Sequence, residues 1–163
     1  HCLSRGLGDV YKRQVVVCFL FHYSVLLWLS RVTPRVKVAT TTQVLIIVLC
    51  LFVAHLIEIG LYAAVYAGTV NWLELGEFTD GKVADAMSYL YYSGVIYTTL
   101  GLGDIEPIGH IRFITATEAL NGFLLITWSA SFTFLAMGRL WPWTHVVPAQ
   151  QPSSTYNLSL IHI

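Results

Sequence analysis

Two long apolar stretches limit what this chain can fold into. Val44–Ala67 holds 24 residues with one glutamate and one histidine, and Phe113–Gly138 holds 26 residues in which Glu118 is the one charged side chain. As helices they would extend about 36 and 39 Å, more than the roughly 30 Å hydrocarbon core of a bilayer. In lipid every backbone polar group needs a partner within the segment, which favours helices over strands. The sequence therefore predicts two membrane-spanning helices.

A third apolar segment, Val15–Leu29, is shorter, and the sequence leaves open whether it forms an extra N-terminal transmembrane helix. Only 11% of the residues are charged and 56% are hydrophobic, whereas a soluble domain carries about 25% charged residues. We therefore predict an all-α membrane protein. The formal net charge is zero, so nothing indicates nucleic acid or an acidic ligand. We expect membrane lipid as a partner, and neither nucleic acid nor a small-molecule substrate.

The distribution of charge predicts the orientation. Basic residues follow the first and the last apolar segments, and they are Arg31, Arg35, Lys37 and Arg139. Such residues gather on the cytoplasmic side of a membrane protein. The region between Gly68 and Arg112 is mainly acidic, with Glu74, Glu77, Asp80 and Asp85 against Lys82. We expect this region to face, or to re-enter from, the outside.

Within this outer region, Asp85–Thr99 reads as a short apolar and aromatic helix. Its 15 residues would extend about 22 Å, too little to cross a membrane. Asp85 lies near the start, where a carboxylate favours a helix N-terminus. A glycine-rich segment follows at membrane depth, and irregular backbone is tolerated there only if protein buries it or if it lines a water-filled path. The pattern predicts a re-entrant helix and a functional loop.

The order of outer helix, short re-entrant helix, glycine loop and inner helix resembles the pore module of potassium channels. The matching run is Thr99–Gly103, Thr-Leu-Gly-Leu-Gly, followed by Asp104. The resemblance extends over about Val44–Leu140 and is greatest to small bacterial channels with one pore loop. It implies a potassium-selective channel that conducts K⁺ passively through main-chain carbonyls. It also implies no enzymatic activity and no cofactor other than the permeant ion.

The loop has the residue types that such a filter requires. Carbonyls that all face one axis need a backbone of alternating handedness, which Gly101 and Gly103 permit because glycine adopts positive φ freely. Leu100 and Leu102 are then expected to turn their side chains into the surrounding protein. K⁺ is expected at Thr99, Leu100, Gly101 and Leu102, in an ion-binding segment of Thr98, Thr99, Leu100, Gly101, Leu102, Gly103 and Asp104.

One chain supplies one loop, so the resemblance implies a homotetramer with closed symmetry. We expect the inner membrane of a bacterium as its location. Residues 15–39 would form the N-terminal hydrophobic segment and a basic cytoplasmic loop, 40–140 the pore domain and 141–157 a short cytoplasmic tail. Ser4–Gln14 and Leu158–Ile163 read as translated sequencing-library adapters, so we expect residues 1–14 and 158–163 to be non-native.

Leu102 departs from the family pattern, which usually has tyrosine there. A tyrosine hydroxyl would bond to the aromatic residues of the short helix, Tyr91 or Tyr92, and leucine cannot. Val95 lies where some members have a glutamate that supports the aspartate, so Asp104 needs another partner or stays solvated. A weakly selective monovalent cation channel is therefore the first alternative. A metal-binding or structural helical membrane protein is the second.

Three ionisable residues lie inside the apolar stretches: His55, Glu58 and Glu118. His55 and Glu58 share a helix face, and Glu118 lies at a comparable depth if the helices are antiparallel. We interpret the three as a static buried hydrogen-bonded cluster, with a pH-sensitive strut behind the filter as the alternative. A di-metal centre is not indicated, because helical di-metal sites need two Glu-x-x-His pairs and only one reversed pair is present.

Gly122 lies midway along the inner helix, where the family often has a gating hinge. The alternative is that a small residue lets neighbouring helices pack closely. The sequence leaves both interpretations open.

Overall fold

The computed structural model describes residues 2–73, 76–79, 83 and 85–141, with side chains from Tyr11 onward. The predicted tail therefore lies outside the described residues from position 142 on. The elements in chain order are α1 (Cys2–Val32), a 3₁₀ turn (Thr33–Arg35), α2 (Thr40–Asn71), β1 (Gly76–Phe78), α3 (Ala86–Tyr97), β2 (Pro107–Gly109) and α4 (Ile111–Leu140).

Three helices in the described part of the chain are long and apolar enough to cross a membrane: Tyr11–Arg35, Thr40–Asn71 and Ile111–Leu140. The all-α membrane fold predicted from the sequence is confirmed. The segment Val15–Leu29, which the sequence left open, lies within helix α1 and within a candidate span. Only 22–28% of the apolar window of each span is buried in the single chain, as expected of surfaces that contact lipid or other chains. The observed helices are longer than the apolar stretches because polar residues extend them at both ends.

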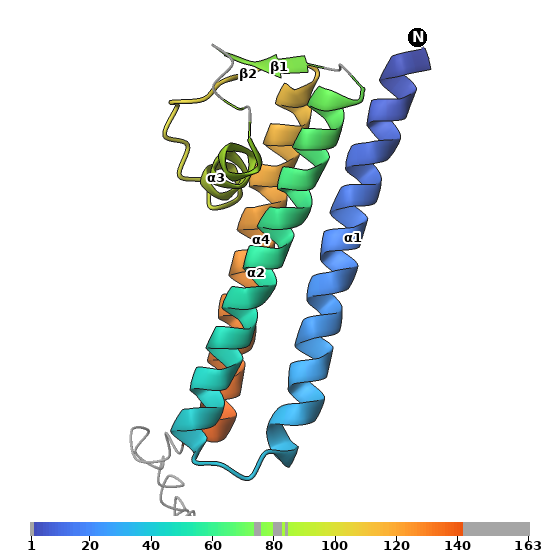
Figure 1. Ribbon diagram of the computed structural model, residues 1–163. Helices are drawn as coiled ribbons and strands as arrows, with labels where there is room; N and C mark the ends of the chain where they lie inside the picture. Colours follow the sequence, from blue (N-terminus) through green and yellow to red (C-terminus); the bar gives the residue numbers. More distant parts are fainter. Residues whose placement is uncertain (1, 74–75, 80–82, 84, 142–163) are drawn as a thin grey trace, which may run out of the picture.

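The basic connection between α1 and α2 and the re-entrant segment lie at opposite ends of the long helices. The end of α1, the start of α2 and the end of α4 lie together, whereas α3 and the two short strands lie near the other end (Figure 1). The four basic residues Arg31, Arg35, Lys37 and Arg139 therefore share one end, as the predicted orientation requires.

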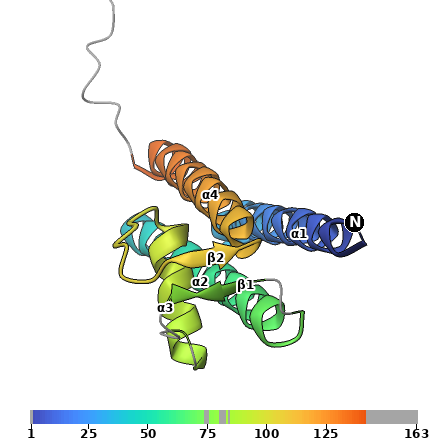
Figure 2. The same ribbon diagram turned by 90° about the horizontal axis from the view of Figure 1, so that it is seen from above.

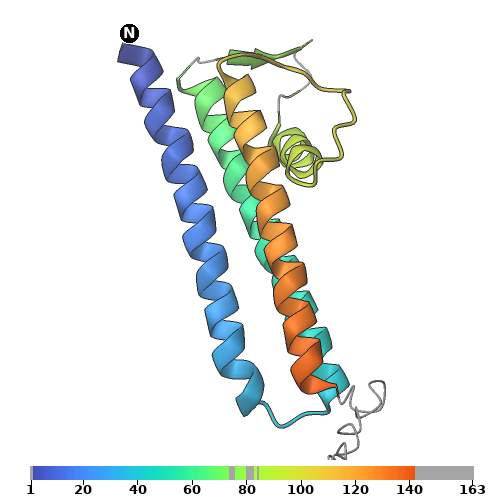
Figure 3. The ribbon, with the colours of Figure 1, turned by 180° about the vertical axis from the view of Figure 1, so that it is seen from behind.

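Helix α3 is short and lies across one side of α2 and α4, with α1 on the opposite side of that pair (Figures 1, 2 and 3). It begins at a defined cap, because the side chain of Asp85 accepts a hydrogen bond of 2.9 Å from the backbone N–H of Ser88. With 12 residues α3 extends about 18 Å, too short to cross a bilayer. It is the re-entrant helix that the sequence predicts.

A two-stranded antiparallel ribbon joins the connection before α3 to the connection after the loop. Gly76 pairs with Gly109, and Phe78 pairs with Pro107. Phe78 is buried and its ring packs edge-on against three tyrosine rings, those of Tyr66, Tyr89 and Tyr92. The ribbon was not predicted from the sequence, and it fixes both ends of the re-entrant segment above α2 and α4.

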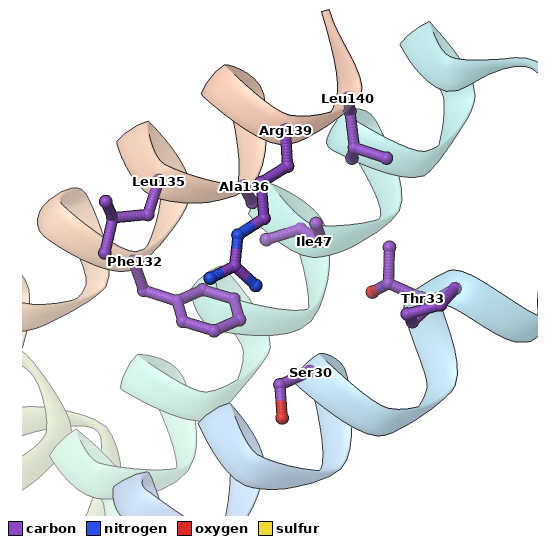
Figure 4. Close-up of a pocket in the computed structure, with 9 residues that line it drawn as sticks. Ser30, Thr33, Ile47, Phe132, Leu135, Ala136, Arg139 and Leu140 are labelled. Atoms are coloured by element: carbon purple, nitrogen blue, oxygen red, sulfur yellow. The ribbon is translucent and has the colours of Figure 1, made fainter.

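At the opposite end, α1, α2 and α4 leave an apolar groove of about 370 Å³. Its walls include Ile47 from α2 and Phe132 from α4 (Figure 4). Arg139 also lines this groove, and its side chain extends back toward Phe132 (Figure 4). A cluster of four buried residues packs α1 against α2 at this end: Leu26, Leu29, Ile47 and Leu51.

Candidate functional site

The glycine loop begins directly at the end of α3 and is tied to the last turn of that helix. The carbonyl of Val95 accepts hydrogen bonds from the backbone N–H groups of Leu100, at 3.0 Å, and of Gly101, at 3.4 Å. The backbone N–H of Thr99 donates to Ile96 at 2.9 Å. Val95 thus supports the loop through its main chain, while its own side chain is buried.

The backbone of the loop changes handedness at every second residue. Thr99 has φ 58°, Gly101 has φ 56° and Gly103 has φ 74°. A Cβ atom at either glycine would meet nothing within 4 Å of it in the chain. Glycine is therefore required at these two positions by the positive φ and not by a lack of space. Thr99 is the one described non-glycine residue with positive φ, a conformation that is unusual for a β-branched residue and that occurs at functional sites.

The loop side chains are exposed in the single chain. Leu100 is 63% exposed and Leu102 is 57% exposed, so a single chain does not cover these two side chains. The residues from Thr98 to Asp104 are all exposed. They lie on the side of α2 and α4 that faces away from α1 (Figures 2 and 3).

Asp104, which needed a partner in place of the missing glutamate, has one in α3. The hydroxyl of Tyr91 donates a hydrogen bond of 2.8 Å to Asp104 Oδ2. This bond raises the pKa of Tyr91 above its usual value, because ionising the phenol would remove the donor next to a carboxylate. Tyr92 is instead buried and shares a hydrogen bond of 2.8 Å with the Thr115 hydroxyl.

Gly122 on α4 lies directly against the end of α3. A Cβ atom at Gly122 would come within 2.1 Å of the carbonyl oxygen of Tyr97 and 2.9 Å of its carbonyl carbon. Any larger residue must push the end of α3, and with it the loop, away from α4. This contact favours the close-packing interpretation of Gly122 over the hinge.

His55 and Glu58 meet in a buried cluster that three further residues complete. The Nδ1 atom of His55 lies 3.0 Å from Glu58 Oε2, and the Nδ1 atom of His22 lies 2.9 Å from Glu58 Oε1. The Tyr97 hydroxyl donates a hydrogen bond to Glu58. Ser129 Oγ lies 3.0 Å from Nε2 of His55 and 3.1 Å from Nε2 of His22. We call these five residues the histidine cluster. It joins all four α-helices.

Glu118 belongs to a separate network and contacts neither His55 nor Glu58 in any described hydrogen bond. Its carboxylate accepts hydrogen bonds from Tyr66 at 2.5 Å and from Ser93 at 2.6 Å. This network joins α2, α3 and α4, so the three ionisable residues are divided between two clusters. His22, Tyr97 and Ser129 were missed by sequence reasoning, although His22 is a histidine within an apolar stretch and was a visible signal.

A comparison with protein families identifies the fold around this loop. The family model described as an ion channel matches residues 38–138, more than half of the chain. This chain belongs to the ion channel family. Separate comparisons with the curated proteins and with the solved structures each found no match.

The ion channel match includes α2, α3, the glycine loop and nearly all of α4, and α1 precedes it. Together with three apolar helices, the family makes this chain an integral membrane protein with an ion channel domain. The resemblance to a channel pore module is confirmed at this level.

Proposed function

We propose that four copies of this ion channel assemble around one axis and conduct K⁺ passively through the carbonyls of Thr99–Gly103. Entry of a dehydrated cation requires several oxygens to replace its water shell at once. The observation that carries the proposal is the positive φ at Thr99, Gly101 and Gly103, since alternating handedness turns successive carbonyls of an extended segment to one side.

The exposure of the loop supports the assembly. Leu100 and Leu102 are large apolar side chains that their own chain leaves more than half exposed, next to the proposed ion path. Neighbouring chains around an axis on this side of α2 and α4 would cover them. The orientation of α3 supports the same axis, because the partly negative C-terminal end of a helix favours a cation. We place the channel in the inner membrane of a bacterium, with the acidic outer region facing the periplasm.

The test is a flux assay on purified protein in liposomes. A K⁺ gradient should drive flux that barium blocks, and Na⁺ should carry much less. Gly101→Ala should abolish this flux while the tetramer stays assembled, because φ 56° is strained for alanine. Gly60→Ala is the matched control, since a Cβ atom there meets nothing within 4 Å. A well-assembled wild type without any cation flux would refute the proposal.

A weakly selective monovalent cation channel is the second candidate, and one observation favours it. Leu102 has no hydroxyl, so Tyr91 bonds to Asp104 at the outer end of the loop and no such bond holds position 102. A less rigid loop discriminates less between ions of different radius. Reversal potentials in mixed K⁺ and Na⁺ decide between the two candidates, because the weakly selective channel would show a reversal potential close to zero under opposed gradients.

A further inference from the structure

The histidine cluster lies behind the loop and has no part in the proposed conduction path. His22 comes from α1, His55 and Glu58 from α2, Tyr97 from α3 and Ser129 from α4. His22 and Glu58 are fully buried, and the His55 side chain is 17% exposed. One nitrogen of each histidine and one carboxylate oxygen lie within 4.8 Å of one another. We propose that the cluster is a binding site for a transition-metal ion, with Zn²⁺ as the best fit.

The ligand atoms face one another, as a metal site requires. Both Nδ1 atoms point at the Glu58 carboxylate, at 2.9 and 3.0 Å from its two oxygens. Ligands at about 2.0–2.1 Å from a tetrahedral ion are about 3.3 Å apart, so a small outward movement of the three side chains makes room for the ion. The Tyr97 hydroxyl lies 2.9 Å from His55 Nδ1 and offers a fourth ligand.

A count of hydrogens shows that one contact in the cluster lacks a hydrogen when Glu58 is a carboxylate and both rings are neutral. Glu58 as a carboxylate only accepts, so both histidines must carry their hydrogen on Nδ1. Both Nε2 atoms are then acceptors, and both contact Ser129 Oγ, which has a single hydrogen to donate. One of these two buried contacts is left without a hydrogen.

With a metal ion on the two Nδ1 atoms, both of these contacts contain a hydrogen. Each neutral ring then carries its hydrogen on Nε2, and the serine oxygen accepts from both rings with its two lone pairs. Metal-bound histidines commonly donate their other N–H to such an outer partner, which fixes the ring orientation. Ser129 is therefore a positioning residue, and it holds the two rings from α4.

The ligand types select the class of ion. Two imidazoles and a carboxylate suit Zn²⁺ and its first-row neighbours, whereas Ca²⁺ and Mg²⁺ prefer oxygen ligands alone. The Glu58 charge offsets part of the ion's charge at a depth where an isolated charge is costly. Since His22 lies on α1, before the matched residues 38–138, the ion would join this helix to the channel domain.

The experiment measures metal content and does not depend on ion conduction. The purified chain is loaded with Zn²⁺, dialysed against a weak chelator and analysed by elemental mass spectrometry. About one zinc per chain is expected from the His₂Glu ligand set. Loading with Co²⁺ instead should give the visible absorption of four-coordinate cobalt, and X-ray absorption should report two imidazole ligands.

Matched variants assign the metal to these residues. His22→Gln and Glu58→Gln should lose the ion, and Ser129→Ala should bind it roughly 10- to 100-fold more weakly. Two control variants should keep the metal ion. They are His110→Gln, which changes an exposed histidine, and Glu118→Gln, which changes the buried carboxylate of the other network. Folded wild type without zinc or cobalt would overturn the proposal. Equal metal content in His22→Gln would overturn it as well.

Discussion

The carbonyl oxygen of Tyr97 occupies the space next to Gly122 so closely that a Cβ atom at position 122 would lie 2.1 Å from it. Tyr97 is the last residue of α3, and the glycine loop starts at the next residue. The inner helix therefore sets the depth at which the loop sits, through one position without a side chain.

Gly122→Ala should destabilise the fold by about 1–3 kcal/mol, as overpacking of a well-packed contact does. Gly138→Ala on the same helix is the control, because a Cβ atom there meets nothing within 4 Å and alanine gains up to about 1 kcal/mol of helix propensity. Thermal unfolding in detergent compares the two variants. If Gly122 is a hinge instead, Gly122→Ala will unfold like the control and alter only opening of the channel.

The stability of the fold should depend on pH through Asp85, the cap of the re-entrant helix. Hydrogen bonds from the Ser88 hydroxyl and backbone N–H lower the pKa of Asp85 below its usual value. A depressed pKa in the folded state stabilises the fold above the unfolded pKa of about 3.9, and this contribution is lost as the pH falls through the folded value. Melting temperature should therefore fall on acidification below roughly pH 4.

Asp85→Asn isolates this contribution, because asparagine also caps helices but does not titrate. At neutral pH its melting temperature should stay close to that of the wild type. As the pH is lowered through the acidic range, the melting temperature of the wild type should then fall relative to that of Asp85→Asn. Parallel melting curves for the two proteins over that range would show that Asp85 is not the titrating group.

Tyr66→Phe should destabilise the fold by about 1–3 kcal/mol, the cost of leaving a buried polar group with one partner fewer. Tyr66 is fully buried and donates a hydrogen bond of 2.5 Å to the buried carboxylate of Glu118. Tyr23→Phe is the matched control, since Tyr23 is 51% exposed on α1. Chemical unfolding of both variants provides the comparison, and equal stabilities would contradict the role given to this network.

Tyr91→Phe should weaken the outer end of the loop and raise Na⁺ permeability relative to K⁺ several-fold. It removes the donor to Asp104 and keeps the ring. The same bond raises the pKa of Tyr91, so the wild-type contact should persist at neutral pH and be lost only as the pH rises above the usual tyrosine value of about 10. Reversal potentials of wild type and variant at neutral pH provide the measurement, and an unchanged ratio would contradict it.

The sequence predicted the channel module because its signals are local. Apolar length predicts α2 and α4, and glycines spaced by two residues predict the positive φ at Gly101 and Gly103. The positive φ at Thr99 was not predicted, because nothing in a threonine side chain favours it.

The missed features depend on contacts between distant residues. The ribbon pairs Gly76 with Gly109 through strands of three residues, too short to show an alternating pattern. His22 and Ser129 are 107 residues apart and meet only because α1 packs on the channel domain. For the same reason the sequence grouped Glu118 with Glu58 by depth alone, although the two carboxylates bond to different residues.

The most direct test of the ion path is a structure of the assembled protein in Rb⁺ or Tl⁺, with the heavy ions located by anomalous scattering. The account predicts a fourfold assembly with ion density on its axis, between the carbonyls of Thr99, Leu100, Gly101 and Leu102. An assembly whose glycine loops lie away from a shared axis, or one without ions between those carbonyls, would contradict it.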